Sequence, residues 1–534
     1  MLQKEAQRLE GAYSAFYEIL GRPPRDEELQ GQDSLRSLLR KLMESKETRA
    51  IYGIGNVANI GEFVKAGYRA ILKRDPSMYE ESEWRVKLAF RRATKEEFLE
   101  TLWNSPEHQG FSVPDTPLIF DENISPVTLV WPTWWEPPRI DLERKRDSGM
   151  TLMFYGDPVS PTGYATGCRE YLIELYRLGV DIKLCYTARK VYASWQEHTL
   201  PAYLLNFFHV LASNPRTSEV SLQYWVADTF RRLTTYNIGW TYWELTRISP
   251  RWVAKLNLMN EVMTCSTFTA QVFRDSGVAS PITVTPHGVR GEIFGSRNIP
   301  ECRVMKGGRE IKLPEFVIVT NFQWDERKNP RMLIRGFLRA FKPSDDVALL
   351  ILTYWGSSHR FELMKILQMI TKVRAELDVR EHPPIYVTNQ FAPTPYHVAC
   401  FYKLGSLFAL PSRGEGWGFP YSECMAMGIP CVATRWSGNM DFMNDDVAFL
   451  IRVKRLVRAV GSRWPQVVEA SNYGACWAEP DEDHFVELLR RAYNYPEHTK
   501  HVGAKARSFI LENFPWSKGA EVIYKSLEKF YSMM

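Results

Sequence analysis

Short apolar strands alternate with amphipathic helices through most of this chain, and this alternation limits the possible folds more than any other feature. The first series starts at TLMFY (residues 151–155), passes through a loop and a helical stretch that stops at Gly179, and returns to a strand at VDIKLCY (180–186). A strand, a helix and a second strand in this order build a parallel sheet covered by helices. We therefore predict a first doubly wound α/β domain over residues 151–300.

A second series of the same kind follows. Its expected strands are EFVIVT (315–320), VALLILTY (347–354), PIYVTN (384–389), SLFALPS (406–412) and PCVAT (430–434), with helical stretches between them. This predicts a second doubly wound domain over residues 301–514, followed by a C-terminal helix over residues 515–534. Two such domains would face each other across a cleft, and ligands of these sheets bind at the carboxyl ends of the strands.

The first 110 residues show a helical pattern with an imperfect two-fold repeat. FYEILGRPP (16–24) aligns with YRAILKRDP (68–76). Aromatic and leucine residues at helical spacing, interrupted by proline turns, predict an all-α domain. The repeat resembles a module of some bacterial proteins linked to surface polysaccharides. Residues 111–150, rich in proline, tryptophan and charge, are predicted to form a linker that partly packs on the next domain.

Composition places the chain among globular proteins and narrows its partners. It has 534 residues, 45% hydrophobic and 24% charged, and its net charge of +5 does not call for nucleic acid. The opening residues MLQKEAQRLEG lack the apolar core of a signal peptide, and no stretch approaches the ~20 apolar residues of a membrane span. The eight cysteines form no Cys-x-x-Cys pair and have no histidine at metal-ligand spacing. We expect a cytoplasmic protein with reduced thiols and no metal site.

The loop after SLFALPS carries the strongest functional signal. In RGEGWGFPYSECMAMG (413–428), Gly416 and Gly418 allow a ligand to approach the backbone, and the following helix directs its amide groups at the same point. Such a helix N-terminus suits a phosphate or diphosphate. Glu415 and Glu423 lie on opposite sides of that anion site, where each carboxylate can accept hydrogen bonds from hydroxyl groups. Hydroxyl groups on both sides of a diphosphate describe a nucleotide sugar.

The same residues carry a family resemblance that covers residues 150–534. PSRGEGWGFPYSECMAMGIPCVAT (411–434) resembles the donor site of the retaining glycosyltransferases called family four, which have the two-domain GT-B fold with two Rossmann-like domains. NFQWDERKNPRMLIRGFLRAF (321–341) resembles their phosphate-binding loop, with Lys328 at the position of its lysine. Gln323 stands where many members have an arginine, and Arg327 would take over that charge.

The resemblance implies a role for each matching residue. Glu423 would bind the ribose hydroxyls of the donor and Glu415 the hydroxyls of the transferred sugar, while Lys328 and Arg327 would neutralise the departing diphosphate. The other donor contacts would come from the glycine-rich loop, from the first loop of the N-terminal domain and from the pocket of the base, at Gly416, Trp417, Gly418, Phe419, Gly163, Tyr164 and Gln390. The fold also implies that no cofactor or metal is needed and that the final helix crosses back to the N-terminal domain.

Two further features each allow two interpretations. Glu244, within NIGWTYWELTRISPRW (237–252), could position or deprotonate an acceptor hydroxyl, or it could be a structural carboxylate paired with Arg247 or Arg251. The tryptophans around it favour packing over a sugar platform. The basic run IRVKRLVRAV (451–460) could contact an anionic membrane surface or a polyanionic acceptor, although charge runs of this kind are usually solvated faces.

The sequence therefore predicts a retaining, metal-independent glycosyltransferase that moves a sugar from a nucleotide-diphosphate donor to a saccharide acceptor. The expected setting is the synthesis of a surface polysaccharide or glycoconjugate, in the cytoplasm or at the inner face of the membrane. A sugar-nucleotide epimerase or a phosphorylase on the same fold is an alternative. So is a non-catalytic scaffold that binds partners through the helical repeats.

Overall fold

The computed structural model describes α7 (Lys95–Trp103) and residues 123–132, 139–144, 146–160, 162–186, 200–355, 360–392, 394–462 and 464–534, together with a few single positions before residue 95. The chain divides into two compact units, Met1–Ile119 and Phe120–Met534. In the first unit α7 is a helix, whereas the predicted two-fold repeat lies almost wholly outside the described residues.

The first sheet of the second unit contains six parallel strands in the order β4-β3-β5-β6-β7-β8. They are β3 (Thr151–Gly156), β4 (Asp181–Tyr186), β5 (Val220–Tyr224), β6 (Tyr236–Trp240), β7 (Glu261–Thr264) and β8 (Ile282–Val284). Every residue of the central strand β5 is buried, as expected where helices cover both faces of a sheet. The helices are α9 (Gly163–Arg177), α10 (Ala202–Ser213), η2 (Ala227–Thr229), α11 (Pro250–Leu256), α12 (Thr267–Asp275) and α13 (Gly291–Phe294).

The second sheet contains seven parallel strands in the order β1-β13-β12-β11-β14-β15-β16. They are β1 (Ile124–Pro126), β11 (Phe316–Gln323), β12 (Val347–Tyr354), β13 (Ile385–Thr388), β14 (Leu407–Leu410), β15 (Cys431–Thr434) and β16 (Phe449–Ile451). Its helices are η3 (Glu326–Lys328), α14 (Pro330–Ala340), α15 (Arg360–Glu376), α16 (Pro395–Tyr402), α17 (Phe419–Met427), η4 (Gly438–Asp441), α19 (Glu482–Asn494) and α20 (Pro496–Asn513). The prediction of two doubly wound α/β domains is confirmed.

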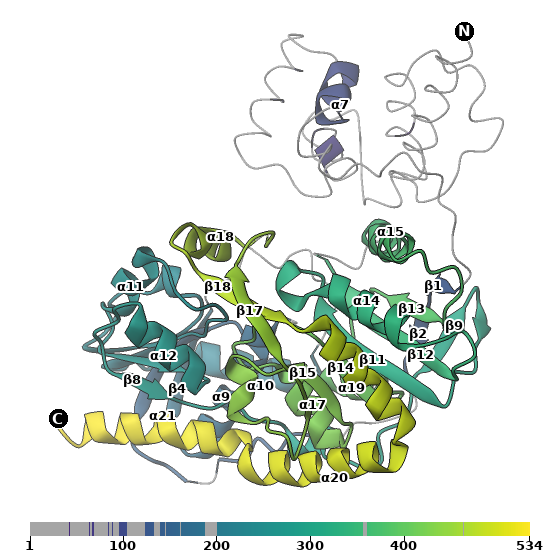
Figure 1. The fold of residues 1–534 in the computed structure, drawn as a ribbon. Coiled ribbons are helices and arrows are strands. Elements are labelled where there is room, and N and C mark those ends of the chain that lie inside the picture. Colours follow the sequence, from purple (N-terminus) through teal and green to yellow (C-terminus); the bar gives the residue numbers. More distant parts are fainter. Residues whose placement is uncertain are drawn as a thin grey trace. The chain divides into compact units, whose positions relative to one another are not determined.

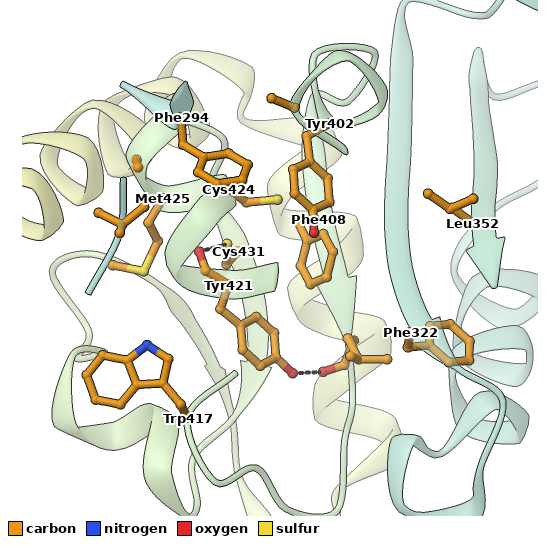
Figure 2. Packing of buried hydrophobic residues seen from close by; sticks show 14 of the residues in the cluster. Phe294, Phe322, Leu352, Tyr402, Phe408, Trp417, Tyr421, Cys424, Met425 and Cys431 are labelled. Carbon is orange, nitrogen blue, oxygen red and sulfur yellow. Dashed lines mark hydrogen bonds between the residues drawn. The ribbon is translucent and has the colours of Figure 1, made fainter. Parts of the chain in front are cut away.

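Aromatic and sulfur-containing side chains fill the space between α17 and the second sheet (Figure 2). The Tyr421 hydroxyl donates a hydrogen bond to the backbone oxygen of Leu410, at 2.6 Å, so the helix is fixed to the end of β14. The Tyr421 ring also meets Phe408 edge-on, with ring centroids 5.5 Å apart. The residues that follow the glycine-rich loop are therefore anchored in the core, which makes the position of that loop rigid.

The segment predicted to be a linker supplies two strands. β1 extends the second sheet by pairing with β13, and β2 (Thr128–Val130) pairs with β9 (Arg303–Lys306), which also pairs with β10 (Arg309–Glu310). Both new strands are three residues long, so neither shows an alternating pattern that could separate it from a loop. The chain therefore contributes to the second domain before it builds the first.

A hairpin of the second domain packs on the first domain. β17 (Val453–Arg458) and β18 (Cys476–Pro480) are antiparallel and are joined through α18 (Pro465–Asn472). The inner side chains of this segment share one apolar cluster with residues of the first domain, and the cluster includes Val467, Ala470, Trp477, Trp243, Ile248 and Trp252. The two domains are thus joined by a small hydrophobic core beside the region where their loops meet.

The final helix returns to the first domain. α21 (Trp516–Tyr531) packs on α9, with Ile523 and Leu527 fully buried (Figure 1). The Tyr531 hydroxyl lies 2.9 Å from the Thr151 hydroxyl and donates to the Thr151 backbone oxygen at 2.8 Å. None of the helices in the described part of the chain is long and apolar enough to span a bilayer.

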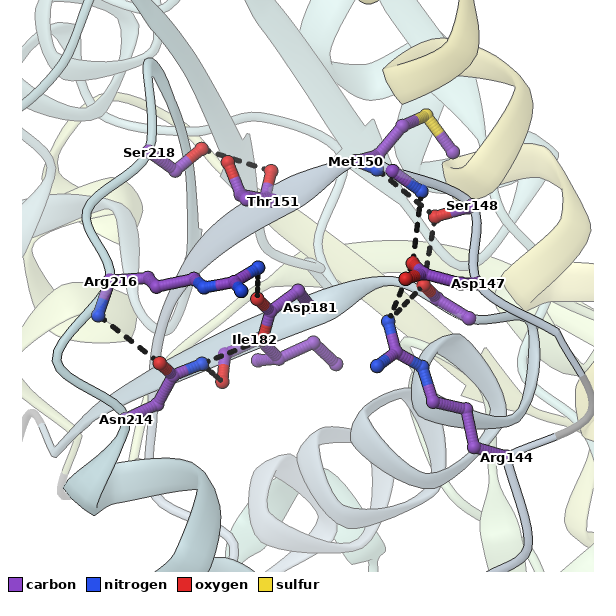
Figure 3. Close-up of polar contacts among 12 residues, drawn as sticks. Arg144, Asp147, Ser148, Met150, Thr151, Asp181, Ile182, Asn214, Arg216 and Ser218 are labelled. Atoms are coloured by element: carbon purple, nitrogen blue, oxygen red, sulfur yellow. Dashed lines mark hydrogen bonds and ion pairs between the residues drawn. The ribbon is translucent and has the colours of Figure 1, made fainter.

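Polar contacts fix the amino ends of the first sheet (Figure 3). The Asn214 amide donates to Asp181 Oδ1 at 2.7 Å and to the Ile182 backbone oxygen at 3.0 Å, and Arg216 Nη1 lies 2.6 Å from Asp181 Oδ2. These side chains tie the chain before β5 to the start of β4. Because they lie at the amino ends, the opposite ends of the strands are left to form the site.

Candidate active site

The two loops with the strongest sequence signals leave neighbouring strands of the second sheet. β11 lies between β12 and β14, so the strand order reverses between β11 and β14. In doubly wound sheets, the loops that leave the carboxyl ends at such a point diverge and form the ligand site. The loop after β11 carries Arg327 and Lys328, and the loop after β14 carries Glu415. The topology therefore brings together residues that are 87 positions apart in the chain.

Local backbone geometry presents the two cationic side chains. Asp325 caps the short helix η3, because its side chain accepts a hydrogen bond from the Arg327 amide at 3.0 Å. Asn329 then adopts a left-handed conformation, with φ of 55°, and Pro330 begins α14. Asparagine tolerates this conformation better than most residues, and proline suits the first turn of a helix. The sharp turn leaves Arg327 and Lys328 at the end of the sheet.

Glu415 binds both cations. Lys328 Nζ donates to Glu415 Oε1 at 2.6 Å and to Oε2 at 2.8 Å, and Arg327 Nη1 donates to Oε2 at 3.1 Å. The Glu415 amide donates to the Ser437 hydroxyl at 2.8 Å, which holds the loop in place. Glu415 is only 4% exposed. A buried carboxylate between two cations is a fixed electrostatic unit and not a solvated surface pair.

The charges of this cluster set one another's protonation. Burial disfavours ionisation of Glu415, but Lys328 and Arg327 hold its pKa below the ordinary value of a glutamate. Burial lowers the pKa of Lys328, and Glu415 offsets that effect only in part. Burial also disfavours the charge on Arg327, but Glu244 and Glu415 raise its pKa above its ordinary value. Two cationic side chains are thus held by carboxylates in a dry environment, an arrangement that suits the binding of an anion.

Glu244 joins the cluster from the first domain. It follows β6, and its Oε1 lies 3.6 Å from Arg327 Nη2. Neither of the two local partners suggested by the sequence pairs with Glu244: Arg251 pairs with Asp228 at 2.9 Å, and among the described residues no ion pair joins Glu244 to Arg247. Burial is the main cause of the raised pKa of Glu244, with Arg327 acting in the opposite direction. Glu244 is thus a buried carboxylate that faces the cations of the other domain.

The tryptophans near Glu244 are packing residues. Trp240 is fully buried, and Trp243 and Trp252 are each 2% exposed. The Trp243 indole donates to the backbone oxygen of Arg247 at 2.8 Å. The interpretation of these rings as core residues agrees with this burial.

Glu423 lies on the second turn of α17, not on the first, apart from the cationic cluster. The hydroxyl of Tyr402 donates to Glu423 Oε2 at 3.1 Å, and burial raises the pKa of Glu423 to about 7. Gly418 precedes the helix with φ of 97°, and Gly428 ends it with φ of 80°. Glycine adopts this left-handed conformation without steric cost. A carboxylate with one hydrogen-bond donor and a raised pKa has acceptor capacity left for a ligand.

The first domain meets the glycine-rich loop at several points. A Cβ atom on Gly416 would lie 2.4 Å from Tyr242 Cδ2, whereas one on Gly163 would lie 3.5 Å from Phe419 Cδ2. Tyr164 stacks on Tyr242 with ring centroids 4.2 Å apart. The loops of both sheets thus face each other in direct contact, and only glycine fits at position 416.

The remaining predicted site residues have mixed surroundings. The Trp417 side chain is 3% exposed and packs in the core (Figure 2). A ligand at the glycine-rich loop could therefore contact only the backbone of this residue. The Gln390 carboxamide accepts a hydrogen bond from the Leu129 amide at 2.5 Å and donates to the Leu129 oxygen at 3.4 Å. That side chain therefore binds the edge strand β2.

Ser437 and Tyr402 were not identified from the sequence, although the Ser437 hydroxyl accepts a hydrogen bond from the Glu415 backbone amide and the Tyr402 hydroxyl donates one to the Glu423 carboxylate. Ser437 has φ of 76°, a value that a non-glycine residue adopts only under strain. The Ser437-Gly438 pair is a weak turn signal that could have drawn attention to it. Tyr402 lies in a helix and gives no such signal. Within the described residues, no group of three His, Cys, Asp or Glu side chains could hold a metal ion.

Comparisons with known proteins address the fold and the second domain. A family model described as "Glycosyl transferases group 1" matches residues 314–464, the range that holds Arg327, Lys328, Glu415 and Glu423. Sucrose-phosphate synthase from Thermosynechococcus elongatus is similar in structure, with a TM-score of 0.50 and 12% identity, over 72% of this chain and 100% of that protein. The comparison with curated proteins found no significant match.

Lower scores relate the chain to other solved structures. HepE of Anabaena in complex with UDP and glucose has a TM-score of 0.46 and 12% identity, over 71% of this chain and 99% of that protein. The α,α-trehalose-phosphate synthase (UDP-forming) from Burkholderia vietnamiensis has a TM-score of 0.45 and 8% identity, over 72% of this chain and 100% of that protein. The likeness to sucrose-phosphate synthase confirms the GT-B fold, and residues 314–464 of this chain match the model of the glycosyl transferases group 1 family.

Proposed function

We propose that this protein is a retaining, metal-independent glycosyltransferase that moves a sugar from a nucleotide-diphosphate donor to a saccharide acceptor. The observation that carries the proposal is the buried cluster of Arg327, Lys328 and Glu415 at the switch point of a group 1 glycosyltransferase domain. Two cations beside the N-terminus of α17 suit a diphosphate.

The donor would bind by exchange of anions. Lys328 and Arg327 are paired with Glu415, so an incoming diphosphate would take over both cations and release the carboxylate. The released Glu415 would then accept hydrogen bonds from hydroxyls of the sugar that is transferred. Glu423 would accept hydrogen bonds from the ribose hydroxyls, which favour its ionised form and lower its pKa from about 7.

The chemical step needs no protein nucleophile in this scheme. The oxygen of an acceptor hydroxyl forms a bond to the anomeric carbon on the face from which the diphosphate leaves, and the electrons of the broken bond pass to the diphosphate oxygen. Lys328 and Arg327 stabilise the charge that develops there, which is the task of a metal ion in other transferases. Glu244 orients the acceptor hydroxyl, whose proton passes to the departing diphosphate.

The acceptor would approach from the side of the first domain. A growing saccharide of a surface polysaccharide or glycoconjugate fits the resemblance of the N-terminal repeat. Glu244, Tyr164 and Tyr242 lie on the first-domain side of the interface, where such an acceptor would approach.

Thermal unfolding tests the donor site. The unfolding temperature is measured with each of a panel of nucleoside diphosphates and nucleotide sugars, with and without EDTA. A ligand at 100 times its dissociation constant should stabilise the protein by about 2.7 kcal/mol. We expect one base to be selected, no effect of EDTA, and loss of the shift in Lys328→Met. The matched control is Lys505→Met, which removes an exposed lysine of α20.

Transfer itself is tested with the donor identified in this way. Product analysis by NMR should show the same anomeric configuration in product and donor. An inverted product would refute the retaining mechanism, and activity that EDTA abolishes would refute metal independence. If no nucleotide shifts the unfolding temperature, the proposal of a nucleotide-sugar transferase fails.

A further inference from the structure

The outer side of the segment from β17 to β18 concentrates exposed apolar side chains. Of the ten large apolar side chains that are exposed among the described residues, five lie between positions 456 and 473. They are Leu456 (50% exposed), Val460 (63%), Trp464 (39%), Val468 (47%) and Tyr473 (50%). We call this set the apolar face. Scattered exposed apolar residues need no explanation, but a cluster marks an interaction surface.

The apolar face is distinct from the core of the same segment. Val467 and Ala470 of α18 are buried in the cluster shared with the first domain. Val468 of α18 and Trp464, which immediately precedes the helix, are four positions apart and are both exposed. α18 lies beside β17 and β18 (Figure 1), and Arg458 donates to the Ser471 backbone oxygen at 3.0 Å, which joins the end of β17 to the end of α18. One segment thus has a buried side and an exposed apolar side.

Basic residues surround the apolar face. The sequence has five of them between positions 452 and 463, and it has no aspartate or glutamate from position 447 to 468. Arg452 lies 3.8 Å from Asp481, and Arg458 is bound to the backbone as described. Lys454 and Arg455 are exposed and form no hydrogen bond or ion pair with any described residue. The nearby carboxylates are paired elsewhere: Asp483, whose pKa Lys454 helps to lower, pairs with Arg339, and Glu479, which stands opposite Arg455 in the β17–β18 ladder, pairs with Arg413. The ammonium and guanidinium groups of Lys454 and Arg455 can therefore contact an external anion.

We propose that the apolar face and its basic residues dock on an anionic lipid bilayer. Apolar and aromatic side chains that insert at the headgroup level, combined with basic residues that meet the anionic surface, bind proteins peripherally. A soluble polyanion would engage the basic residues and leave the apolar ones in water. A second copy of this chain would bring two basic surfaces together, which costs free energy.

Docking at this surface would place the candidate site relative to the bilayer. The backbone of Cys476 in β18 exchanges two hydrogen bonds with Thr246, each 2.9 Å long. Thr246 is two residues from Glu244, so the docking segment and the acceptor-side loop form one rigid connection. The inference goes beyond the proposed function, because lipid binding can be measured without any donor.

Sedimentation of the full-length protein with vesicles tests the proposal. The vesicles contain phosphatidylcholine alone or with 30 mol% phosphatidylglycerol. We expect binding to the anionic vesicles that weakens as salt is raised. Each basic residue near the surface contributes about five-fold to the affinity, so Lys454→Gln/Arg455→Gln should weaken binding about thirty-fold. Leu456→Gln/Val468→Gln should weaken it as well, and the residual binding should be more sensitive to salt.

Matched variants separate this surface from general charge and hydrophobicity. Lys505→Gln/Lys525→Gln removes two exposed lysines of α20 and α21, and Val210→Gln/Tyr495→Gln removes two exposed apolar side chains elsewhere. Both controls should bind as the unchanged protein does. Equal binding to neutral vesicles, no binding to anionic vesicles, or equal effects of the control variants would overturn the proposal. So would a concentration-dependent dimer that the Leu456→Gln/Val468→Gln variant loses, because a second copy would then cover the face.

Discussion

Replacing Glu415 with glutamine should destabilise the second domain while it strengthens the binding of inorganic diphosphate. The substitution keeps the shape of the side chain but removes the charge that faces Lys328 and Arg327, at 2.6 and 3.1 Å. Breaking a buried ion pair by removing one partner costs about 3–5 kcal/mol. Glu244 still faces Arg327 at 3.6 Å, so we expect the lower end of this range, about 3 kcal/mol.

Differential scanning calorimetry measures this loss. A change of 3 kcal/mol lowers the unfolding temperature by about 7 °C if a domain of some 200 residues unfolds alone, and by about half of that if both domains unfold together. Diphosphate should recover part of the loss, because it binds Lys328 and Arg327 without competition from the Glu415 carboxylate. The control is Glu482→Gln, whose carboxylate pairs with Arg335 and Arg339 but is 27% exposed. That control should change stability by less than about 1 kcal/mol.

The stability difference between the unchanged protein and Glu415→Gln should depend on pH. The folded-state pKa of Glu415 is below its ordinary value, so its contribution to stability is present above the ordinary pKa and disappears as the pH falls through the folded-state pKa. The difference between the unchanged protein and Glu415→Gln should therefore narrow in acid. The reasoning is wrong if the variant unfolds at the same temperature as the unchanged protein, or if diphosphate shifts both proteins equally.

Three other predictions concern the interface of the two domains. The pKa of Glu423 is raised to about 7. If ribose hydroxyls bind its ionised form, the affinity for the nucleotide sugar, measured by titration calorimetry, should rise about tenfold from pH 6 to pH 8. Glu423→Gln should abolish this rise. Gly416→Ala should lower the unfolding temperature, because the added Cβ would lie 2.4 Å from Tyr242. Gly163→Ala should leave stability unchanged, since its Cβ would make only ordinary van der Waals contacts. Equal unfolding temperatures for the two variants would contradict this prediction. Trp477→Ala should cost about 3–5 kcal/mol in chemical denaturation, since the ring is 2% exposed in the cluster shared by both domains, and a loss below 1 kcal/mol would refute the role of that cluster.

The sequence allowed prediction of the domains and the glycine-rich loop because their signals are local. Buried strands such as 347–354 are continuous apolar runs, and Gly418 and Gly428 mark the two ends of α17 through their positive φ values. The strand β1 could not be predicted in this way, because a three-residue strand at a sheet edge has no period to detect. Its pairing with β13 depends on the tertiary fold alone.

The arrangement of the candidate site was only partly accessible from the sequence. Spacing in the glycine-rich loop identified Glu415, and the resemblance to a phosphate-binding loop identified Lys328, but their direct contact follows from the neighbouring positions of β11 and β14. The pairing of Glu244 with Arg327 joins two domains, and no local pattern encodes it. The sequence suggested partners for Glu244 that are near in the chain, whereas burial and charge selected one from the other domain.

The pairing of β1 with β13 has a consequence for synthesis on the ribosome. Ile124 of β1 pairs with Ile385 of β13, which is 261 positions later in the chain. At translation rates of about 5–20 residues per second, the early strand waits roughly 13–50 s for its partner to be made. An apolar strand left unpaired for that time could join the wrong edge, but this one is three residues long and ends at Pro126. Its shortness and its proline therefore protect the nascent chain until the second domain emerges to receive it.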